Sequence, residues 1–205
     1  MNIIDLSHEI NNNSPVYPGD DKTELTIAKY LKKDGYNAYK ISSFFHTATH
    51  IETPSHLLVS NKTITSYDIT HFIGGGVVLN FEGKTSLTLN DDIKNIDLED
   101  KIVLLYTGFD KNYHMDSYFK DHPLVTEELT NYLISKKIRI LGIDFPSPDC
   151  EPYLMHEKLF KNNILIIENL TNLKKLLSIK RFNIHAFPLK MNTEASFVRV
   201  IAIET

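Results

Sequence analysis

Strand-like segments outnumber helical ones in this chain, and the two kinds do not alternate. Segments 102–106, 139–144 and 164–170 are rich in apolar residues and predict three strands, the first two of them buried. Residues 2–6 predict a short strand, and segments 24–30 and 38–46 alternate polar and apolar residues as half-buried strands do. Segments 181–190 and 195–204 add two further strands. This order predicts an α/β protein with a mixed sheet, because a βαβ repeat would alternate strands with helices.

Helical patterns are few. Residues 126–138 predict a helix with Thr126 as its N-cap and acids in its first turn, and residues 150–163 predict a second. Residues 65–74 predict a helical turn. The run Gly74-Gly75-Gly76 is interpreted as a turn that leads into a strand, and it cannot present a helix N-terminus to a phosphate. GxGxxG, P-loop and GxSxG motifs are absent, so no motif supports a nucleotide-binding or a serine-hydrolase function.

Length and charge narrow the class of protein. A chain of 205 residues without linkers or repeats predicts one domain over residues 1–205. The net charge is −4 and the basic residues form only pairs, which argues against a nucleic-acid partner. No apolar run is long enough to span a membrane, and the N-terminus does not resemble a signal peptide. A single cysteine, Cys150, excludes an internal disulfide framework, so we expect a cytoplasmic protein.

The stretch FFHTATHIETPSH, residues 44–56, holds three of the nine histidines and a glutamate. Imidazole and carboxylate groups are ligands for Zn²⁺, Mn²⁺ or Fe²⁺. On a straight strand, the Cα atoms of His46 and His50 would lie ~13 Å apart, too far for one ion. A helix would bring these two together but turn Glu52 away. A strand that bends sharply near Ala48 would gather His46, His50 and Glu52, and Pro54 could then turn His56 towards the same centre.

Two interpretations of this stretch stay open at this point. The histidines could form a metal or catalytic site, or they could be solvated side chains on a loop. Glu168 follows the apolar run 164–167, where a buried carboxylate is costly unless it is paired or metal-bound. A glutamate at a strand end can also simply face water. His156, on the second predicted helix, is by itself an ordinary polar position.

The motifs resemble the cyclase-like metal-dependent hydrolases, the family that includes bacterial kynurenine formamidase. HTATHIETPSH is similar to the family signature HxGTHxDxPxH. In order along the chain, DLSHEI, PVYPGD, LLYTGF, LGIDFPSPD, His156, IIENL, FPLK and FVRVIAIE resemble further segments of the family. The matches run from residue 3 to residue 203. The resemblance implies a mixed-sheet, barrel-like cyclase fold with a few flanking helices.

The resemblance also implies roles for individual residues. His46, His50 and Glu52 match ligands of a first metal ion, and His156 and Glu168 match the remaining ligands of a second ion that Glu52 bridges. His56 matches the general acid/base. Tyr17 matches a substrate-binding position, where the kynurenine formamidases have tryptophan. Zn²⁺, as one or two ions, is the expected cofactor, with Mn²⁺ as the alternative.

Two positions differ from the family pattern. The family usually has aspartate where this chain has Glu52, so the carboxylate must shift by roughly 1 Å or more. The family has glycine where this chain has Ala48. If the glycine serves a positive φ, the alanine must adopt that conformation at some cost in strain.

The function expected from these residues is metal-dependent hydrolysis of a small amide, either an arylformamide or a cyclic amide. If the substrate is formyl-kynurenine, the enzyme acts in tryptophan catabolism. The alternatives are a non-catalytic small-molecule or metal-binding module on the same scaffold, and a structural oligomer component. The expected partners are a small-molecule substrate and further copies of the chain, in a homodimer or homotetramer. Asp144, Ser147 and Asp149 are interpreted as turn formers around two prolines, and His8 and His185 receive no role.

Overall fold

The computed structural model describes all 205 residues. Its main sheet has eight strands in the order β1-β12-β11-β5-β7-β9-β10-β4, and β4 also pairs with β12, which closes seven of them into a barrel-like sheet. The strands β5, β7, β9 and β10 run parallel, and the other pairings are antiparallel. The bounds are β1 (Ile3–Asp5), β4 (His50–Glu52), β5 (Ile73–Asn80), β7 (Ile102–Tyr106), β9 (Ile140–Ile143), β10 (Leu165–Glu168), β11 (Phe182–Pro188) and β12 (Ala195–Glu204). The predicted mixed-sheet, barrel-like fold is confirmed.

Strand β12 closes the sheet because it is long enough to pair with three neighbouring strands. β11 pairs along one edge of it. On the other edge, residues 195–197 pair with β4 and residues 201–203 pair with β1. The short strand β4 is therefore held on both sides, by β12 and by β10. This fixes the histidine-rich segment in the wall of the barrel.

Two apolar cores lie on opposite faces of the sheet. The first fills the barrel and takes residues from all seven strands, such as Ile51, Leu104 and Ile167. The second lies outside, between the parallel strands and the helices, and includes Leu105 and Ile166. Alternate residues of β7 and β10 enter the two cores, as the period-two geometry of a strand requires. The continuous apolar runs in the sequence are explained by this burial on both faces.

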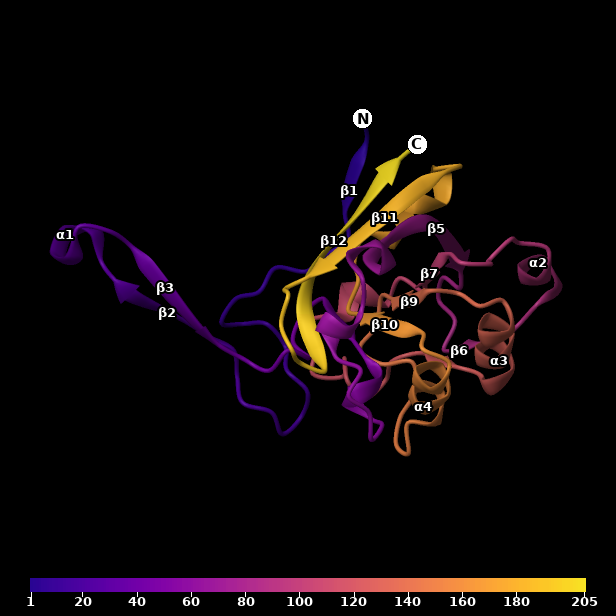
Figure 1. Cartoon of the computed structure of the whole chain (residues 1–205), viewed down its shortest axis with the longest axis horizontal. Helices are drawn as coiled ribbons and strands as arrows, with labels where there is room; N and C mark the ends of the chain where they lie inside the picture. Colours follow the sequence, from indigo (N-terminus) through magenta and orange to yellow (C-terminus); the bar gives the residue numbers. More distant parts are fainter.

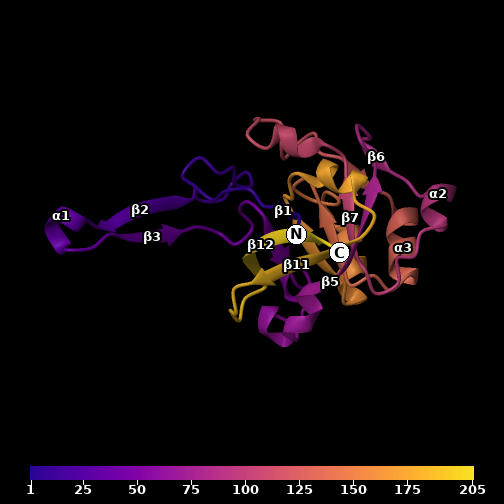
Figure 2. The same ribbon diagram turned by 90° about the horizontal axis from the view of Figure 1, so that it is seen from above.

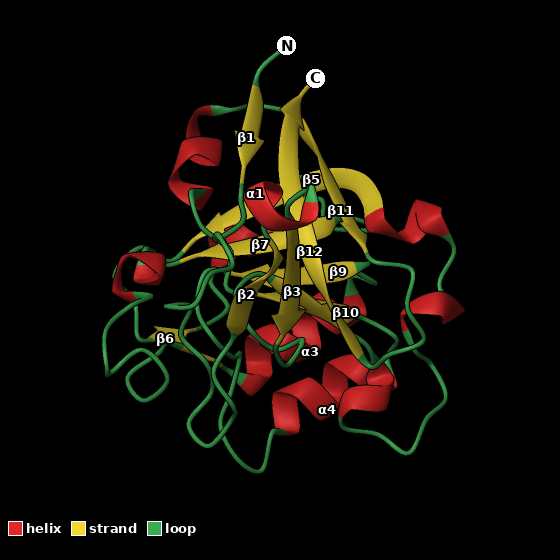
Figure 3. Cartoon of the chain, turned by 90° about the vertical axis from the view of Figure 1, so that its left-hand side faces the viewer, coloured by secondary structure: helices red, strands yellow, loops and turns green.

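Two helices cover the outer face of the barrel, α3 (Glu127–Ser135) and α4 (Leu154–Lys161) (Figure 3). The Thr126 side chain accepts a hydrogen bond from the Leu129 N–H, so the predicted N-cap is confirmed. None of the helices combines the length and the apolar character that a membrane span needs. The remaining small elements are α2 (Asp91–Lys94), β6 (Ser86–Leu87), β8 (Leu124–Val125) and five short 3₁₀ helices, η1 (Pro54–His56), η2 (Ile64–Ser66), η3 (Ile69–Phe72), η4 (Phe109–Asn112) and η5 (Leu173–Ser178).

The interpretation of the triple glycine as a turn is wrong. Gly74, Gly75 and Gly76 lie inside β5 and pair with β11 and β7. A Cβ on Gly76 would lie 2.2 Å from the ring of Phe182, so the strand needs glycine there for close packing. The sequence offered no sign of that neighbour, which lies more than a hundred residues away along the chain.

A hairpin arm, residues 24–42, projects from the barrel (Figures 1 and 2). It consists of β2 (Glu24–Lys29), the one-turn helix α1 (Leu31–Asp34) and β3 (Ala38–Ser42), and its two strands pair only with each other. The predicted strand 38–46 therefore ends at Ser42. Beyond it the chain leaves the arm and turns into the histidine-rich segment.

Candidate metal centre

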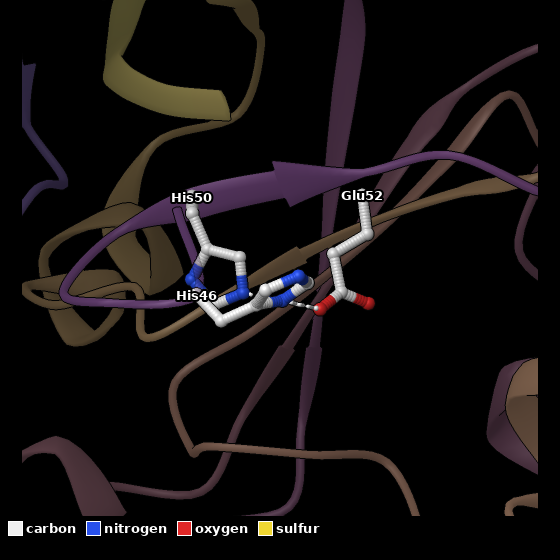
Figure 4. A group of neighbouring side chains, drawn as sticks. All are labelled: His46, His50 and Glu52. Carbon is white, nitrogen blue, oxygen red and sulfur yellow. Dashed lines mark hydrogen bonds and ion pairs between the residues drawn. The ribbon is translucent and has the colours of Figure 1, made fainter. Parts of the chain in front are cut away.

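His46, His50 and Glu52 converge on one side of β4 (Figure 4). His50 and Glu52 share a face of the strand because they are two residues apart, and Ile51 between them enters the barrel core. The turn at residues 45–49 carries His46 back beneath the strand. Ala48 lies in this turn with φ 53°, so the bend expected near Ala48 is present and the alanine adopts the left-handed conformation.

The three side chains present their ligand atoms to one point. His46 Nδ1 lies 2.7 Å from Glu52 Oε1, and His50 Nε2 lies 3.2 Å from the same oxygen. His50 Nδ1–H donates to the carbonyl oxygen of Ala48 at 2.9 Å, which leaves Nε2 as the ligand atom. The bend thus positions His46 and orients His50 together.

His156 and Glu168 approach the same cluster from other elements. Glu168 ends β10 and pairs with His50 across the antiparallel ladder, and His156 lies on α4. His156 Nε2 lies 3.3 Å from Glu168 Oε1 and 3.5 Å from Glu52 Oε2. The two carboxylate oxygens of Glu52 therefore face two different sets, one with His46 and His50 and one with His156 and Glu168. All five predicted ligand residues are brought together, on the outer face of the barrel.

Two buried oxygens in this cluster, Glu52 Oε2 and Glu168 Oε1, form no hydrogen bond, although His156 Nε2 lies 3.5 and 3.3 Å from them. Leaving a buried carboxylate oxygen without a partner is costly. Both atoms belong to the ligand set that includes His156, so a divalent cation held by this set would offset the negative charge of both oxygens. The donor set of imidazole nitrogens and carboxylate oxygens also fits Zn²⁺ or Mn²⁺. The extra methylene of Glu52 does not remove its carboxylate from either set.

The carboxylates of the cluster favour the charged forms of the histidines. Burial lowers the pKa of His46, but Glu194 and Glu52 outweigh this effect and raise it to about 10. Burial likewise opposes the charged form of His50, whose pKa rises to about 9 beside Glu168 and Glu52. Burial would raise the pKa of Glu52, yet the surrounding histidines hold it well below its usual range. The site is therefore built to hold positive charge next to two carboxylates.

His56 lies at the edge of this cluster and belongs to neither ligand set. It ends the 3₁₀ helix η1, which begins at Pro54. Its ring lies 4.2 Å from that of His46, and its Nε2 is 3.9 Å from Glu52 Oε1, farther than the other histidines. Burial is the main reason why the pKa of His56 is lowered, so its ring is neutral at pH 7 and can accept a proton.

A cavity of about 300 Å³ opens over the cluster. Its lining includes the aromatic side chains of Tyr17, Phe44, Phe119 and Tyr153 beside polar and acidic residues. The Tyr17 hydroxyl lies 3.2 Å from that of Tyr153, and the Tyr17 ring meets Phe119 edge-on. No lysine or arginine lines the cavity. Tyr17, the predicted substrate-binding residue, therefore lines the same cavity as the cluster.

The interpretation of Asp144 and Asp149 as turn formers is incomplete. Asp149 Oδ1 lies 2.5 Å from His156 Nδ1, and its other oxygen accepts from the Met155 N–H, so it orients the histidine at the start of α4. Asp144 is buried and accepts hydrogen bonds from Thr107 and Gly108, which ties the loop after β7 to the loop after β9. In the sequence, only the spacing of seven residues could have indicated the contact between Asp149 and His156.

Two further residues at the site received no role from the sequence. Asn169 follows Glu168, has φ 56°, and donates from Nδ2 to the Ala48 carbonyl oxygen at 3.0 Å. Glu194 precedes β12, and its Oε1 lies 3.4 Å from His46 Nε2. Asn169 lies in the segment IIENL, but neither its contact nor that of Glu194 follows from the local sequence, because both depend on how distant strands pair.

The chain is similar in sequence and fold to several known proteins. Residues 4–150 match the family described as "Putative cyclase". An uncharacterized protein of Methanocaldococcus jannaschii is 34% identical over 99% of this chain and 100% of its own length. A kynurenine formamidase of Bacillus cereus is 26% identical over 81% of this chain and 80% of its own. The structure of isatin hydrolase A from Labrenzia aggregata superposes with a TM-score of 0.89 at 24% identity, over 100% of this chain and 94% of that one.

Proposed function

The chain belongs to the cyclase family, and from this membership we propose that it is a metal-dependent hydrolase of a small amide. The observation that carries the proposal is the pair of buried carboxylates, Glu52 and Glu168, each with an oxygen that forms no hydrogen bond. The similarity to kynurenine formamidases supports the amide class. The substrate is an arylformamide or a cyclic amide, so the bond cleaved is a C–N bond other than a peptide bond.

The proposed cofactor is Zn²⁺, as one or two ions, with Mn²⁺ as the alternative. His46, His50 and Glu52 would hold one ion, and Glu52, His156 and Glu168 would hold the other. A bound divalent ion supplies an activated water at neutral pH and polarises the scissile carbonyl. Asp149 would keep His156 in the orientation that its Nε2 needs.

His56 is the proposed general acid/base. It lies beside the two ligand sets but outside them, so its ring nitrogens remain free to move a proton. In the neutral form it accepts a proton from the attacking water. As the imidazolium it then donates that proton to the leaving nitrogen of the amide. His56 lines the cavity, so a substrate bound there can reach it.

The cavity favours a small aromatic substrate. Tyr17, Phe44, Phe119 and Tyr153 offer ring faces and edges against which an aryl group can pack. Since no lysine or arginine lines the cavity, a free carboxylate on the substrate would find neither of these partners away from the metal centre. An uncharged aryl amide or aryl lactam is the compound that this surface suits best.

The test is hydrolysis by the purified protein, stripped of metal and then supplied with Zn²⁺ or Mn²⁺. The substrates are N-formyl-kynurenine, simple formanilides, aryl lactams and aryl lactones. Turnover of an amide that depends on the added ion is the expected result. Metal binding without turnover of any substrate would favour the non-catalytic binding module. Failure to bind either ion would overturn the metal-dependent function.

We also propose that the protein is a homo-oligomer, a homodimer or homotetramer, in which the hairpin arm contacts a second copy. Cross-strand pairing places Leu25, Ile27, Tyr39 and Ile41 on one face of the arm. Ile27, Tyr39 and Ile41 are 43%, 67% and 45% exposed. An isolated two-stranded hairpin is marginally stable, and such an apolar face is normally covered.

Charge favours a second copy of the same chain as the cover. Residues 24–42 carry four lysines and two acids, a net charge of +2, whereas the whole chain carries −4, so the remainder carries −6. A basic arm is attracted to the acidic body of a neighbour, while two arms would repel each other.

We further propose a cytoplasmic location, since Cys150 is free and exposed. Cell fractionation tests that location directly.

A further inference from the structure

We propose that Glu194 is a positioning residue for the metal centre, the carboxylate that holds His46 in the orientation and tautomer needed to bind the ion. This role rests on the proposed metal centre. Glu194 lies in the loop between β11 and β12, far in sequence from the three residues of the first ligand set. Its Oε1 is 3.4 Å from His46 Nε2.

The two nitrogens of His46 face opposite partners. Nδ1 points into the first ligand set, 2.7 Å from Glu52 Oε1, and Nε2 points to Glu194. A neutral imidazole carries one N–H, so a ring that coordinates through Nδ1 keeps its proton on Nε2. That N–H would donate to Glu194. A carboxylate behind a metal-bound histidine fixes the ring and makes the coordinating nitrogen a stronger ligand.

Glu194 lies behind His46 and does not itself belong to the ligand set. The carboxylate and imidazole atoms that gather within 4.8 Å of one another around the first site come from His46, His50 and Glu52. Glu194 also does not line the cavity above the site. Its position therefore suits an indirect effect on the ion through His46.

The backbone holds Glu194 in register with the ligand segment. Ala195, the next residue, pairs with Glu52 across β12 and β4. The carbonyl oxygen of Glu194 accepts hydrogen bonds from Thr53 N–H at 2.9 Å and from the Thr53 hydroxyl at 2.8 Å. These bonds use only the main chain of Glu194, so replacing its side chain leaves them in place. The carboxylate is thus free to act on His46 while the loop is anchored independently.

The other two ligand histidines are also oriented by an oxygen on the side of the ring away from the cluster, which supports the same role for Glu194. His50 Nδ1 is held by the Ala48 carbonyl, and His156 Nδ1 is held by Asp149. With Glu194 assigned to His46, each of the three histidines in the two ligand sets has one nitrogen towards the cluster and the other towards a fixed oxygen. The Glu194 side chain is 39% exposed, so its effect is expected at the lower end of the range for such partners.

The experiment measures metal affinity rather than turnover. Metal-free wild type, Glu194→Gln and Glu194→Ala are titrated with Zn²⁺ or Mn²⁺ alone against a chromophoric chelator. Glu204→Gln serves as the matched control, because it removes one carboxylate from the far end of β12, the strand that follows Glu194, where its partner is Asn2. We expect Glu194→Ala to bind the ion about tenfold more weakly, Glu194→Gln to lie between, and Glu204→Gln to match wild type.

A second readout separates positioning from a general loss of structure. In the metal-loaded protein with ¹⁵N-labelled histidine, the spectrum of His46 should show a proton on Nε2, and Glu194→Ala should shift or broaden that signal. Thermal unfolding of the metal-free variants should stay close to wild type. Equal affinity of Glu194→Ala and wild type, or equal weakening by Glu204→Gln, overturns the role of Glu194. Wild type that binds neither ion overturns the metal centre itself and the role together.

Discussion

Glu168 lies directly opposite His50 in the antiparallel pair of β10 and β4, with 3.4 Å between Glu168 Oε2 and His50 Nε2. Residues that face each other across such a pair share one side of the sheet. The register of two strands thus brings together two ligand residues that are 118 positions apart. The same register places Glu52 opposite Ile166, so both carboxylates lie on the outer side of the barrel, beneath α4.

Replacing Glu168 with glutamine should remove one metal ion. The variant keeps the size of the side chain but loses the charge that offsets a dication at the set with Glu52 and His156. We expect the ion content to fall by one equivalent, or affinity to fall at least about tenfold, with turnover down about a hundredfold. Elemental analysis after equilibrium dialysis is the measurement. Glu157→Gln, on the exposed side of α4, is the control and should keep its full ion content.

His56→Gln should separate metal binding from chemistry. His56 lies outside both ligand sets, so the variant should keep the wild-type ion content. It cannot transfer the proton, and kcat should fall about 10²–10⁴-fold. Steady-state kinetics with the best substrate of the panel, together with elemental analysis, measure both effects. If the ion is lost along with activity, His56 is a ligand and the proposed role is wrong.

Asn169→Ala should weaken the bend that carries His46. The Asn169 side chain donates to the Ala48 carbonyl and accepts from the buried Tyr118 hydroxyl, so its removal leaves that hydroxyl without a partner. We expect a loss of about 2–3 kcal/mol in the free energy of unfolding and a weaker affinity for Zn²⁺. Denaturant unfolding and chelator competition measure the two quantities.

Asn172→Ala provides the matched control for that prediction. Asn172 also has a positive φ, 62°, and its side chain donates to a backbone carbonyl, that of Asp5, away from the metal centre. It should cost stability and leave the affinity for Zn²⁺ unchanged. A fall in affinity with both variants would attribute the effect of Asn169 to general loosening of the fold.

Much of the fold was predictable because local patterns determine it. Thr126 caps α3, the apolar run at 102–106 is a strand, and the geometry of His46 and His50 required a bend near Ala48. Each of these depends on residues close together in the sequence. The triple glycine was misinterpreted because its cause, the ring of Phe182, belongs to a strand that is distant in sequence.

The supporting residues of the site were not predictable for the same reason. Asp149 could be taken for a turn former because its partner His156 is found only once the start of α4 is known. Asn169 and Glu194 meet the ligand segment through the pairing of β10 and β12 with β4, and that register leaves no trace in the local sequence. The ligand residues were accessible through motif spacing, whereas the residues that orient them were not.

Disrupting the apolar face of the arm should dissociate the oligomer. Tyr39→Glu places a charge on the face shared with Ile27 and Ile41, where it would be buried against a second copy. The mass measured by light scattering should fall to that of one chain, 23.5 kDa. Thr26→Glu, on the opposite face of the same hairpin, should keep the wild-type mass. If wild type already has the mass of one chain at working concentration, the arm does not hold copies together.

His8 should make the protein less stable in mild acid. Its ring stacks on Tyr113 with centroids 3.8 Å apart, and its buried Nε2 has no partner. Burial lowers the pKa of His8 to about 4, against 6.5 in an unfolded chain. At pH 7 the ring is neutral in both states and contributes no pH dependence. As the pH falls from about 6.5 towards 4, the unfolded chain binds a proton that the folded protein does not, so the free energy of unfolding falls.

His8→Phe keeps the stacking and removes the titration. Between pH 7.5 and 4.5, wild type should lose about 1–2 kcal/mol more than the variant, since solvent reaches part of the ring and reduces the full effect. Other groups titrate over this interval in both proteins, so only the difference between the two profiles measures His8. Denaturant unfolding at a series of pH values gives these profiles. Parallel profiles would mean that His8 is protonated in the folded protein as readily as in the unfolded chain, and that its burial against Tyr113 imposes no cost on the charged ring.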